Sequence, residues 1–299
     1  MEQIKKDDKL YSYTSDVRDN DKLRASFNAL TQQTYGFNFE DWYQKGYWGD
    51  RYQPHLLLDG DRAIANVSVN IIEFLIMGEK KTYIQLGTVM TDKDYRKQGL
   101  NRLVMDRVLE KWKDKCDLLY LYANDSVLNY YPKFGFVTVD QYQYSRPLSL
   151  EKEELDVEKL DMSDKKVRDL VIRKISKSKP VASLQMYDNE SLIMFYLSSF
   201  MSDTVYYIKS LDTIAVAEYE GDSLLLYDVF STKEPALDRV IEALATSTTK
   251  KALLGFTPIN KENFDVSLLK EDNTTLFVMG KDINIFKENQ LMFPLLSRA

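Results

Sequence analysis

Hydrophobic and polar residues alternate in a regular order along the first half of the chain. Apolar residues at i, i+4 and i+7 (Leu23, Phe27 and Leu30) indicate an amphipathic helix that begins after Asp19, a good N-cap, and stops at Gly36. A second short helix fits residues 38–48. Runs with strand character occupy residues 10–14, 55–59, 62–76 and 82–91. The last three are separated by short turns, which predicts an antiparallel meander from 55 to 91.

The pattern then returns to helical spacing. Apolar positions predict a helix over residues 99–114 with one buried face, formed by Leu100, Leu103, Val104, Val108 and Trp112. A buried strand follows at 118–123, a short helix at 126–134, and one or two strands at 135–148.

The second half repeats this order without repeating the sequence. The charged stretch 149–179 is typical of helix and linker, and Pro180 stops it. The later elements are an apolar segment at 189–201, strands at 204–211 and 212–231, a helix at 235–246, a strand at 251–257, and closing segments at 274–280 and 291–299. We therefore predict a mixed α+β protein of two domains, 1–148 and 149–299. An unrelated α+β fold for the second domain stays open.

Composition narrows the class of protein. A chain of 299 residues with 44% hydrophobic and 29% charged residues is ordinary for a globular protein. The net charge of −6 argues against nucleic-acid binding and favours cationic small molecules through steering. One cysteine and one histidine exclude an intrachain disulfide and a multi-His metal site, and no metal is predicted. No apolar run approaches the roughly 20 residues of a membrane span, and the N-terminus lacks a signal-peptide core, so we expect a cytoplasmic protein.

Arg96, Lys97, Gln98 and Gly99 stand together where the helix at 99–114 begins. The first N–H groups of a helix have no internal partner, and the helix dipole makes that end partly positive. A glycine there lets a ligand approach the backbone, and Arg102 adds charge. This junction is therefore a candidate phosphate site, although many helices simply follow a polar loop.

Two motifs give the junction a context. The chain has neither the G-x-G-x-x-G of a Rossmann site nor a P-loop. It has R-x-x-G-x-N at 96–101, then a helix, a strand, Asn124, and "YYPKFGF" at 130–136, with Tyr131 seven positions after Asn124. This combination, with "VMTDKDYR" at 89–96, resembles the GNAT family of acetyl-CoA-dependent N-acetyltransferases. Asn101 stands where that family prefers Gly or Ala, and Lys93 replaces its usual Pro.

The resemblance implies a fold and a set of site residues. It implies an N-terminal GNAT fold with a mostly antiparallel central sheet flanked by helices, followed by a diverged GNAT-like domain. In that second domain Glu234 and Pro235 replace the phosphate loop, so no CoA is expected there. The implied general acid is Tyr131. The implied acetyl-CoA-binding residues are Val89, Met90, Thr91, Arg96, Lys97, Gln98, Gly99, Leu100, Asn101, Arg102 and Asn124.

The general base has no motif of its own. Glu73 is a candidate for the base from its position on the third strand. The alternative is that it is a solvated acid on the exposed face of the sheet. Some multi-domain relatives use the C-terminal carboxylate, which here would be Ala299. The single histidine, His55, and the single cysteine, Cys116, fit structural roles. The dense aromatic residues between 35 and 48 fit either an acceptor pocket or core packing.

The function expected from this reading is transfer of acetyl from acetyl-CoA to a primary amine of a small molecule or peptide. Nucleic acid and membrane are not expected partners, and the oligomeric state is left open. The alternative is a non-catalytic acyl-CoA sensor or regulator on the same scaffold.

Overall fold

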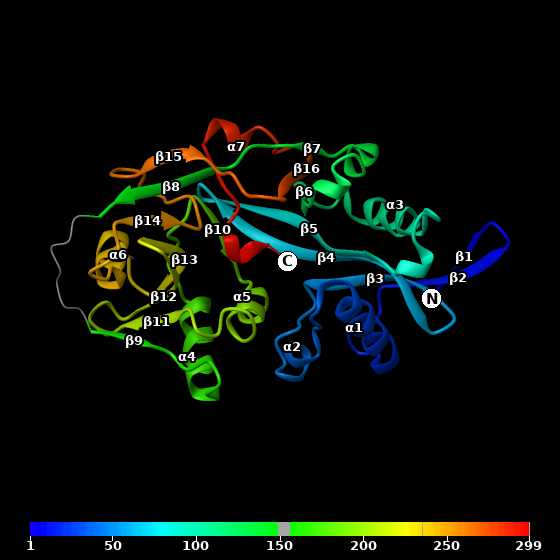
Figure 1. The fold of residues 1–299 in the computed structure, drawn as a ribbon, viewed down its shortest axis with the longest axis horizontal. Coiled ribbons are helices and arrows are strands. Elements are labelled where there is room, and N and C mark those ends of the chain that lie inside the picture. The colour runs from blue at the N-terminus through cyan, green and yellow to red at the C-terminus, as the bar shows by residue number, and fades with distance from the viewer. Residues whose placement is uncertain (149–155, 235, 299) are drawn as a thin grey trace.

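The computed structural model describes residues 1–148, 156–234 and 236–298, and within them the chain forms two sheets (Figure 1). The strands of the first sheet, in spatial order, are β1 (Glu2–Lys6), β2 (Lys9–Thr14), β3 (Tyr52–Asp59), β4 (Arg62–Ile76), β5 (Glu79–Thr91), β6 (Leu118–Ala123), β16 (Thr275–Gly280) and β7 (Val137–Thr138), and β10 (Leu184–Tyr187) pairs with β4. Those of the second sheet are β15 (Asp265–Leu268), β8 (Tyr142–Pro147), β14 (Lys251–Leu254), β13 (Ser223–Ser231), β12 (Thr213–Glu220), β11 (Val205–Ile208) and β9 (Val157–Lys159).

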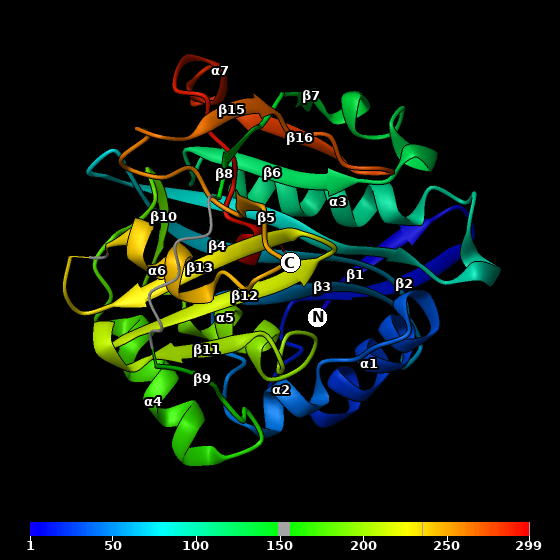
Figure 2. The same cartoon turned by 60° about the vertical axis from the view of Figure 1, so that its left-hand side comes forward.

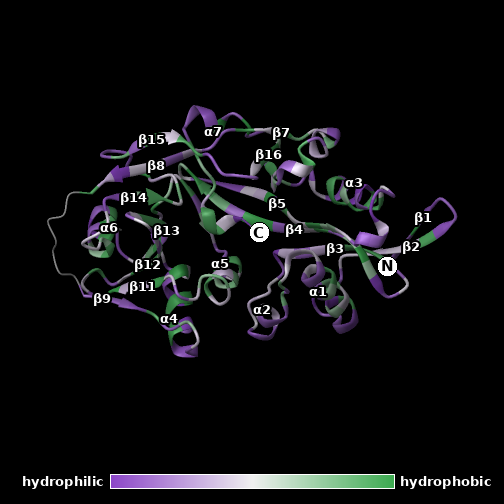
Figure 3. Ribbon diagram, viewed as in Figure 1, coloured by the Kyte–Doolittle hydropathy of each residue, from purple (hydrophilic) through white to green (hydrophobic). Residues whose placement is uncertain are grey.

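Helices cover these sheets. They are α1 (Asp21–Tyr35), α2 (Glu40–Gln44), α3 (Leu100–Trp112), α4 (Lys165–Ser176), α5 (Glu190–Leu197), α6 (Leu237–Leu244) and α7 (Ile285–Glu288). Figure 3 shows hydrophilic and hydrophobic positions along α1, α3 and α4 alike, as expected for helices that cover a core with one face. None of the described helices is both long and apolar enough to cross a bilayer.

The predicted meander and the helix after Gly99 are present as β3, β4, β5 and α3. Two local expectations were wrong. The N-cap of α1 is Asn20, whose side chain accepts the Leu23 N–H, whereas Asp19 pairs with Arg18. The short helix expected at 126–134 is two 3₁₀ turns, η2 (Asp125–Val127) and η3 (Tyr131–Phe134). Pro132 inside that segment has no N–H to extend a helix.

The two halves of the chain exchange strands. In the first sheet, β16 from the C-terminal half lies between β6 and β7. In the second sheet, β8 from the N-terminal half lies between β14 and β15. Figure 1 shows the chain running from β7, beside the first sheet, directly on to β8 in the second sheet. Each sheet is therefore completed by the other half of the chain.

Opposite faces of the first sheet receive different partners, because neighbouring residues of a strand point to opposite faces. Leu57 of β3 packs with Val104 and Val108 of α3. Its neighbour Leu56 packs with Phe27 of α1. On the α1 face the sheet also carries the apolar cluster that joins the two halves, and Figure 2 shows the second sheet in front of the first.

The last described residues of the chain fill the space between the sheets. Leu291, Met292 and Phe293 are fully buried, and the Phe293 ring stacks on Tyr120 of β6 at 3.9 Å between centroids. The following turn, η5 (Leu295–Ser297), receives a hydrogen bond from the Tyr120 hydroxyl to the Ser297 carbonyl, at 2.9 Å.

The exchange of strands predicts how the protein unfolds. Phe277 of β16 is 2% exposed and packs in the core of the first sheet, 5.6 Å from the Tyr131 ring. Phe277→Ala should lower the free energy of unfolding by about 3–5 kcal/mol, because it leaves a cavity where the two halves join. Urea denaturation of this variant should give one transition, shifted as a whole. Ile259→Ala, at an exposed position, is the control. A variant in which one half melts while the other keeps its wild-type midpoint would contradict the shared-sheet account.

Candidate functional site

The first sheet opens between β5 and β6. These parallel strands pair only from Tyr83 to Gln85 on β5 and from Leu118 to Tyr120 on β6. Beyond that point, residues 86–91 of β5 have no strand partner on the β6 side among the described residues. An unpaired strand edge presents backbone N–H and C=O groups that a ligand can bond as a further strand would.

A bulge in β5 accompanies this opening. The register of β4 and β5 shifts between Asn66 and Ser68, and Thr88 adopts a positive φ of 42°. Buried polar side chains hold that conformation. The Thr88 hydroxyl is 2.6 Å from the Ser68 hydroxyl and 2.8 Å from that of Tyr52, and the Asn66 amide donates to the Thr88 carbonyl at 2.8 Å. A bulge of this kind re-aims the strand that follows it.

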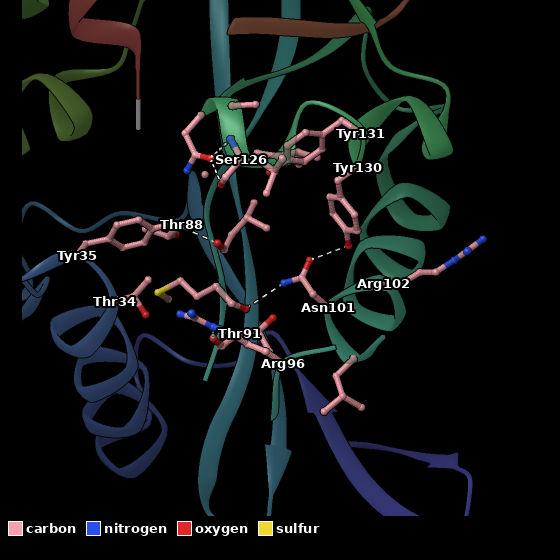
Figure 4. Close-up of a pocket in the computed structure, with 18 of the residues that line it drawn as sticks. Thr34, Tyr35, Thr88, Thr91, Arg96, Asn101, Arg102, Ser126, Tyr130 and Tyr131 are labelled. Carbon is pink, nitrogen blue, oxygen red and sulfur yellow. Dashed lines mark hydrogen bonds between the residues drawn. The ribbon is translucent and has the colours of Figure 1, made fainter. Parts of the chain in front are cut away.

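A cavity of about 780 Å³ occupies the opening (Figure 4). Its walls come from four places in the sequence. These are residues 86–91 of β5, the turn and first residues of α3 between 95 and 102, the end of β6 with the turns up to Tyr131, and the end of α1 with Phe37. Elements far apart in sequence therefore meet around the unpaired edge of β5.

One side of the cavity is positively charged. Gly99 caps α3 with a φ of 70°, and Lys97 before it also has a positive φ, of 63°. This turn and the first residues of α3, whose N–H groups have no partner within the helix, line the cavity together with Arg96 and Arg102, whose side chains are exposed. Lys6 of β1 adds a further charge, since its Nζ lies 3.7 Å from where a Cβ would stand on Gly99. This turn is therefore a candidate anion site by geometry and by charge.

Asn101 ties this helix start to the bulged strands. Its side-chain amide donates to the carbonyls of Met90, at 3.0 Å, and Asn66, at 3.1 Å, and its Oδ1 accepts from the Tyr130 hydroxyl at 3.1 Å. Figure 4 shows Asn101 lying between the strand and Tyr130. The Asn that departs from the family pattern thus has a structural use: a Gly or Ala could make none of these bonds.

Tyr131 presents a free phenol to the cavity. Its ring is 5% exposed and packs against Tyr130, Phe136 and Phe277. Among the described residues, nothing hydrogen-bonds its hydroxyl, whereas that of Tyr130 is taken up by Asn101. Burial raises the pKa of Tyr131 well above the ordinary value of a tyrosine, so its hydroxyl stays protonated at neutral pH.

Tyr35, at the C-terminal end of α1, reaches the same cavity from the opposite wall. Its hydroxyl donates to the Val89 carbonyl at 3.1 Å (Figure 4). Arg96 Nε similarly donates to the Thr91 carbonyl, at 3.2 Å. Side chains thus reach carbonyls at the β5 edge. The sequence carried no signal for Tyr35 beyond the aromatic density around it, because α1 and β5 are far apart along the chain.

The structure brings together nearly all of the residues implied by the resemblance. Val89, Met90, Thr91, Arg96, Lys97, Gly99, Leu100, Asn101, Arg102, Asn124 and Tyr131 all line the cavity. Gln98 does not, and its exposed amide turns back to the Asp94 carbonyl. Asn124 accepts the Ser126 N–H at 3.1 Å and so shapes the turn after β6.

Glu73 does not lie at this site. The register of β4 against β5 places Glu73 opposite Thr82, and the Thr82 hydroxyl donates a hydrogen bond to its carboxylate at 3.0 Å. Thr82 precedes the segment in which β5 separates from β6. Its position therefore gives no support to Glu73 as the base. Ala299, the other candidate, lies outside the described residues. Within the described part of the chain, no Asp, Glu or His lines the cavity.

His55 and Cys116 lie in structural settings. His55 is fully buried, its Nδ1 lies 2.5 Å from the Tyr13 hydroxyl, and burial lowers its pKa to about 3. Cys116 is partly buried, donates to the Trp112 carbonyl at 3.4 Å, and burial raises its pKa to about 11. A thiol in that state is a poor nucleophile.

Comparison with known proteins places these features in a family. Residues 18–139 match the family described as Acetyltransferase (GNAT) domain. That range spans α1 to β7 and contains the parted strands, the Gly99 turn and Tyr131. Residues 18–139 therefore form a GNAT-type domain. The family resemblance expected from the two motifs is thereby confirmed.

Solved structures extend the likeness of fold to most of the chain. A probable N-acyltransferase from Enterococcus faecalis, described as a conserved protein of unknown function, superposes with a TM-score of 0.60 at 12% identity, covering 90% of this chain and 71% of its own. A GCN5-related N-acetyltransferase from Kribbella flavida gives 0.55 at 16% identity, covering 90% and 70%. Eis1 from Mycobacterium abscessus gives 0.55 at 12%, covering 89% and 73%. No curated protein matches the sequence. Over most of the chain, the mixed α+β fold is thus shared with these solved structures.

Proposed function

We propose that this protein transfers the acetyl group of acetyl-CoA to a primary amine. One observation carries the proposal: the free phenol of Tyr131, the unpaired edge of β5 and the positive turn at Gly99 line a single cavity. A protein that only binds CoA would need the unpaired edge of β5 and the positive turn at Gly99. A protonated, unpartnered hydroxyl among them is what a leaving thiolate requires.

The chain's own groups suit the parts of acetyl-CoA. The N–H groups from Lys97 to Arg102 and the cationic side chains around them would hold the pyrophosphate. The backbone of Val89, Met90 and Thr91 would pair with the pantetheine arm along the open strand edge. Gly99 leaves space for close approach because it has no Cβ, and the described atoms within 4 Å of an added Cβ belong to Lys6.

The reaction would be direct transfer. The amine nitrogen attacks the acetyl carbonyl carbon, the carbon–sulfur bond breaks, and the new amide nitrogen loses its proton to solvent. Tyr131 gives its phenolic proton to the departing CoA thiolate and regains one from water. Backbone N–H groups near Val89 and Met90 would polarise the thioester carbonyl. A general acid of this kind contributes about 10²- to 10⁴-fold to the rate.

Removing the phenolic hydroxyl tests the acid. Tyr131→Phe should lower kcat for thiol release from acetyl-CoA by at least about tenfold and leave acetyl-CoA affinity within a few-fold. Tyr130→Phe is the matched control, since its hydroxyl is bonded to Asn101 and should be dispensable to within a few-fold. Equal turnover of the two variants would remove Tyr131 from the mechanism. Unchanged acetyl-CoA binding with no thiol release from the wild type would favour a sensor instead.

Adding a negative charge at Gly99 tests whether this turn holds the pyrophosphate. Gly99→Asp should weaken acetyl-CoA binding by more than about tenfold, because a carboxylate would face the pyrophosphate. Gly99→Ala introduces the same strained φ without the charge, so it separates backbone strain from electrostatics. Calorimetry should rank affinity as wild type, then Gly99→Ala, then Gly99→Asp. Wild-type affinity in Gly99→Asp would place the pyrophosphate elsewhere.

A further inference from the structure

The wall of the cavity opposite the positive turn is aromatic. Tyr35 and Phe37 line the cavity, and their rings stack at 6.1 Å between centroids. Phe200, after α5, meets Phe37 edge to face at 5.3 Å and an interplanar angle of 88°. Tyr35 is 48% exposed and Phe200 57% exposed. Exposed rings that continue from the wall of a cavity are typical of a ligand-binding surface rather than of core packing.

Both halves of the chain hold these rings in place. Trp42 Nε1 donates to the Ser191 carbonyl at 3.0 Å, which fixes α2 against α5. Beneath the exposed rings, Phe39 and Phe195 stack at 5.2 Å. The exposed rings therefore pack on a buried aromatic layer that already holds them in place, so ligand binding would cost little side-chain entropy.

The charges around the cavity argue against a polycationic acceptor. The described lining contains Arg96, Lys97 and Arg102 and no carboxylate. A polyamine or an aminoglycoside would bring several positive charges to a site that offers it no described ion-pair partner. The net charge of −6 resides elsewhere on the protein and affects approach, not contact.

We propose that the acceptor is a monoamine that carries an aromatic group, such as an arylalkylamine. Its ring would pack on Phe37 and Phe200, with the amine directed along Tyr35 toward Val89 and Tyr131. This inference rests on the proposed acetyl transfer and names the substrate class for it.

Three amines test the inference by thiol release from acetyl-CoA: tryptamine, ethylamine, which lacks a ring, and spermidine, which is polycationic. Tryptamine should have a kcat/KM at least about tenfold above either of the others, since one well-packed ring contact and its buried area supply that factor. Phe200→Ser should raise the KM for tryptamine about tenfold, with kcat within twofold and ethylamine unaffected. Tyr187→Ser, which removes a ring of similar exposure on β10, should change nothing.

Other outcomes separate this inference from the proposed function. Three results would overturn the inference of an aromatic acceptor and leave acetyl transfer standing. They are a comparable kcat/KM for tryptamine and ethylamine, a preference for spermidine, and no effect of Phe200→Ser. Phe200→Ser abolishing a dimer without changing the KM would do the same, since the rings would then serve a second copy. If no amine releases thiol, acetyl transfer fails. Calorimetry of tryptamine with the CoA-loaded protein then decides the inference: binding that Phe200→Ser weakens about tenfold supports it, and absent or unaltered binding overturns it.

Discussion

The site depends on one interruption of hydrogen bonding, the parting of β5 from β6 after Gln85 and Tyr120. A central strand ordinarily satisfies its backbone groups on both sides, so an open edge inside a sheet needs support. Here the hydrogen bond between the Thr88 hydroxyl and the buried Ser68 hydroxyl holds the bulge, and Asn101 fastens the start of α3 to β4 and β5. The opening is therefore built into the fold, and the positive turn and the phenol are arranged around it.

The second sheet contains the same parting but closes it. β13 pairs in parallel with β14 only from Ser223 to Leu226, as β5 does with β6. Beyond that point the chain packs against β13. Leu295 N–H bonds the Gly255 carbonyl at 2.8 Å, and a Cβ on Gly255 would stand 3.0 Å from Tyr227 Cα and 3.1 Å from the Leu295 side chain. The same C-terminal segment also contacts β6, through the hydrogen bond from the Tyr120 hydroxyl to the Ser297 carbonyl, so the second half supports the first sheet.

Local signals in the sequence predicted much of this arrangement. Turn residues and period-two alternation marked the meander, and the glycine, cationic residues and helical spacing marked the turn at Gly99. The motif at 96–101, apart from Gln98, and the pair Asn124 and Tyr131 line one cavity, as the resemblance implied. The loop residue Pro235, cited against a second CoA site, lies outside the described residues.

Features set by long-range pairing could not be read in this way. The sequence predicts β8 and β16 as strands of their own halves, because the pattern of a strand does not determine which strand it pairs with. Glu73 had a suitable place in sequence order, but the register of β4 against β5 decides which residues reach the opening. Lys6, Tyr35 and Phe200 approach the site from distant segments.

The measurement that tests the account most directly is a crystal structure of the protein with CoA. It should contain one CoA per chain, its pyrophosphate on the N–H groups from Lys97 to Arg102 and its thiol near Tyr131. A CoA bound along β13, or away from the β5 edge, would contradict the account.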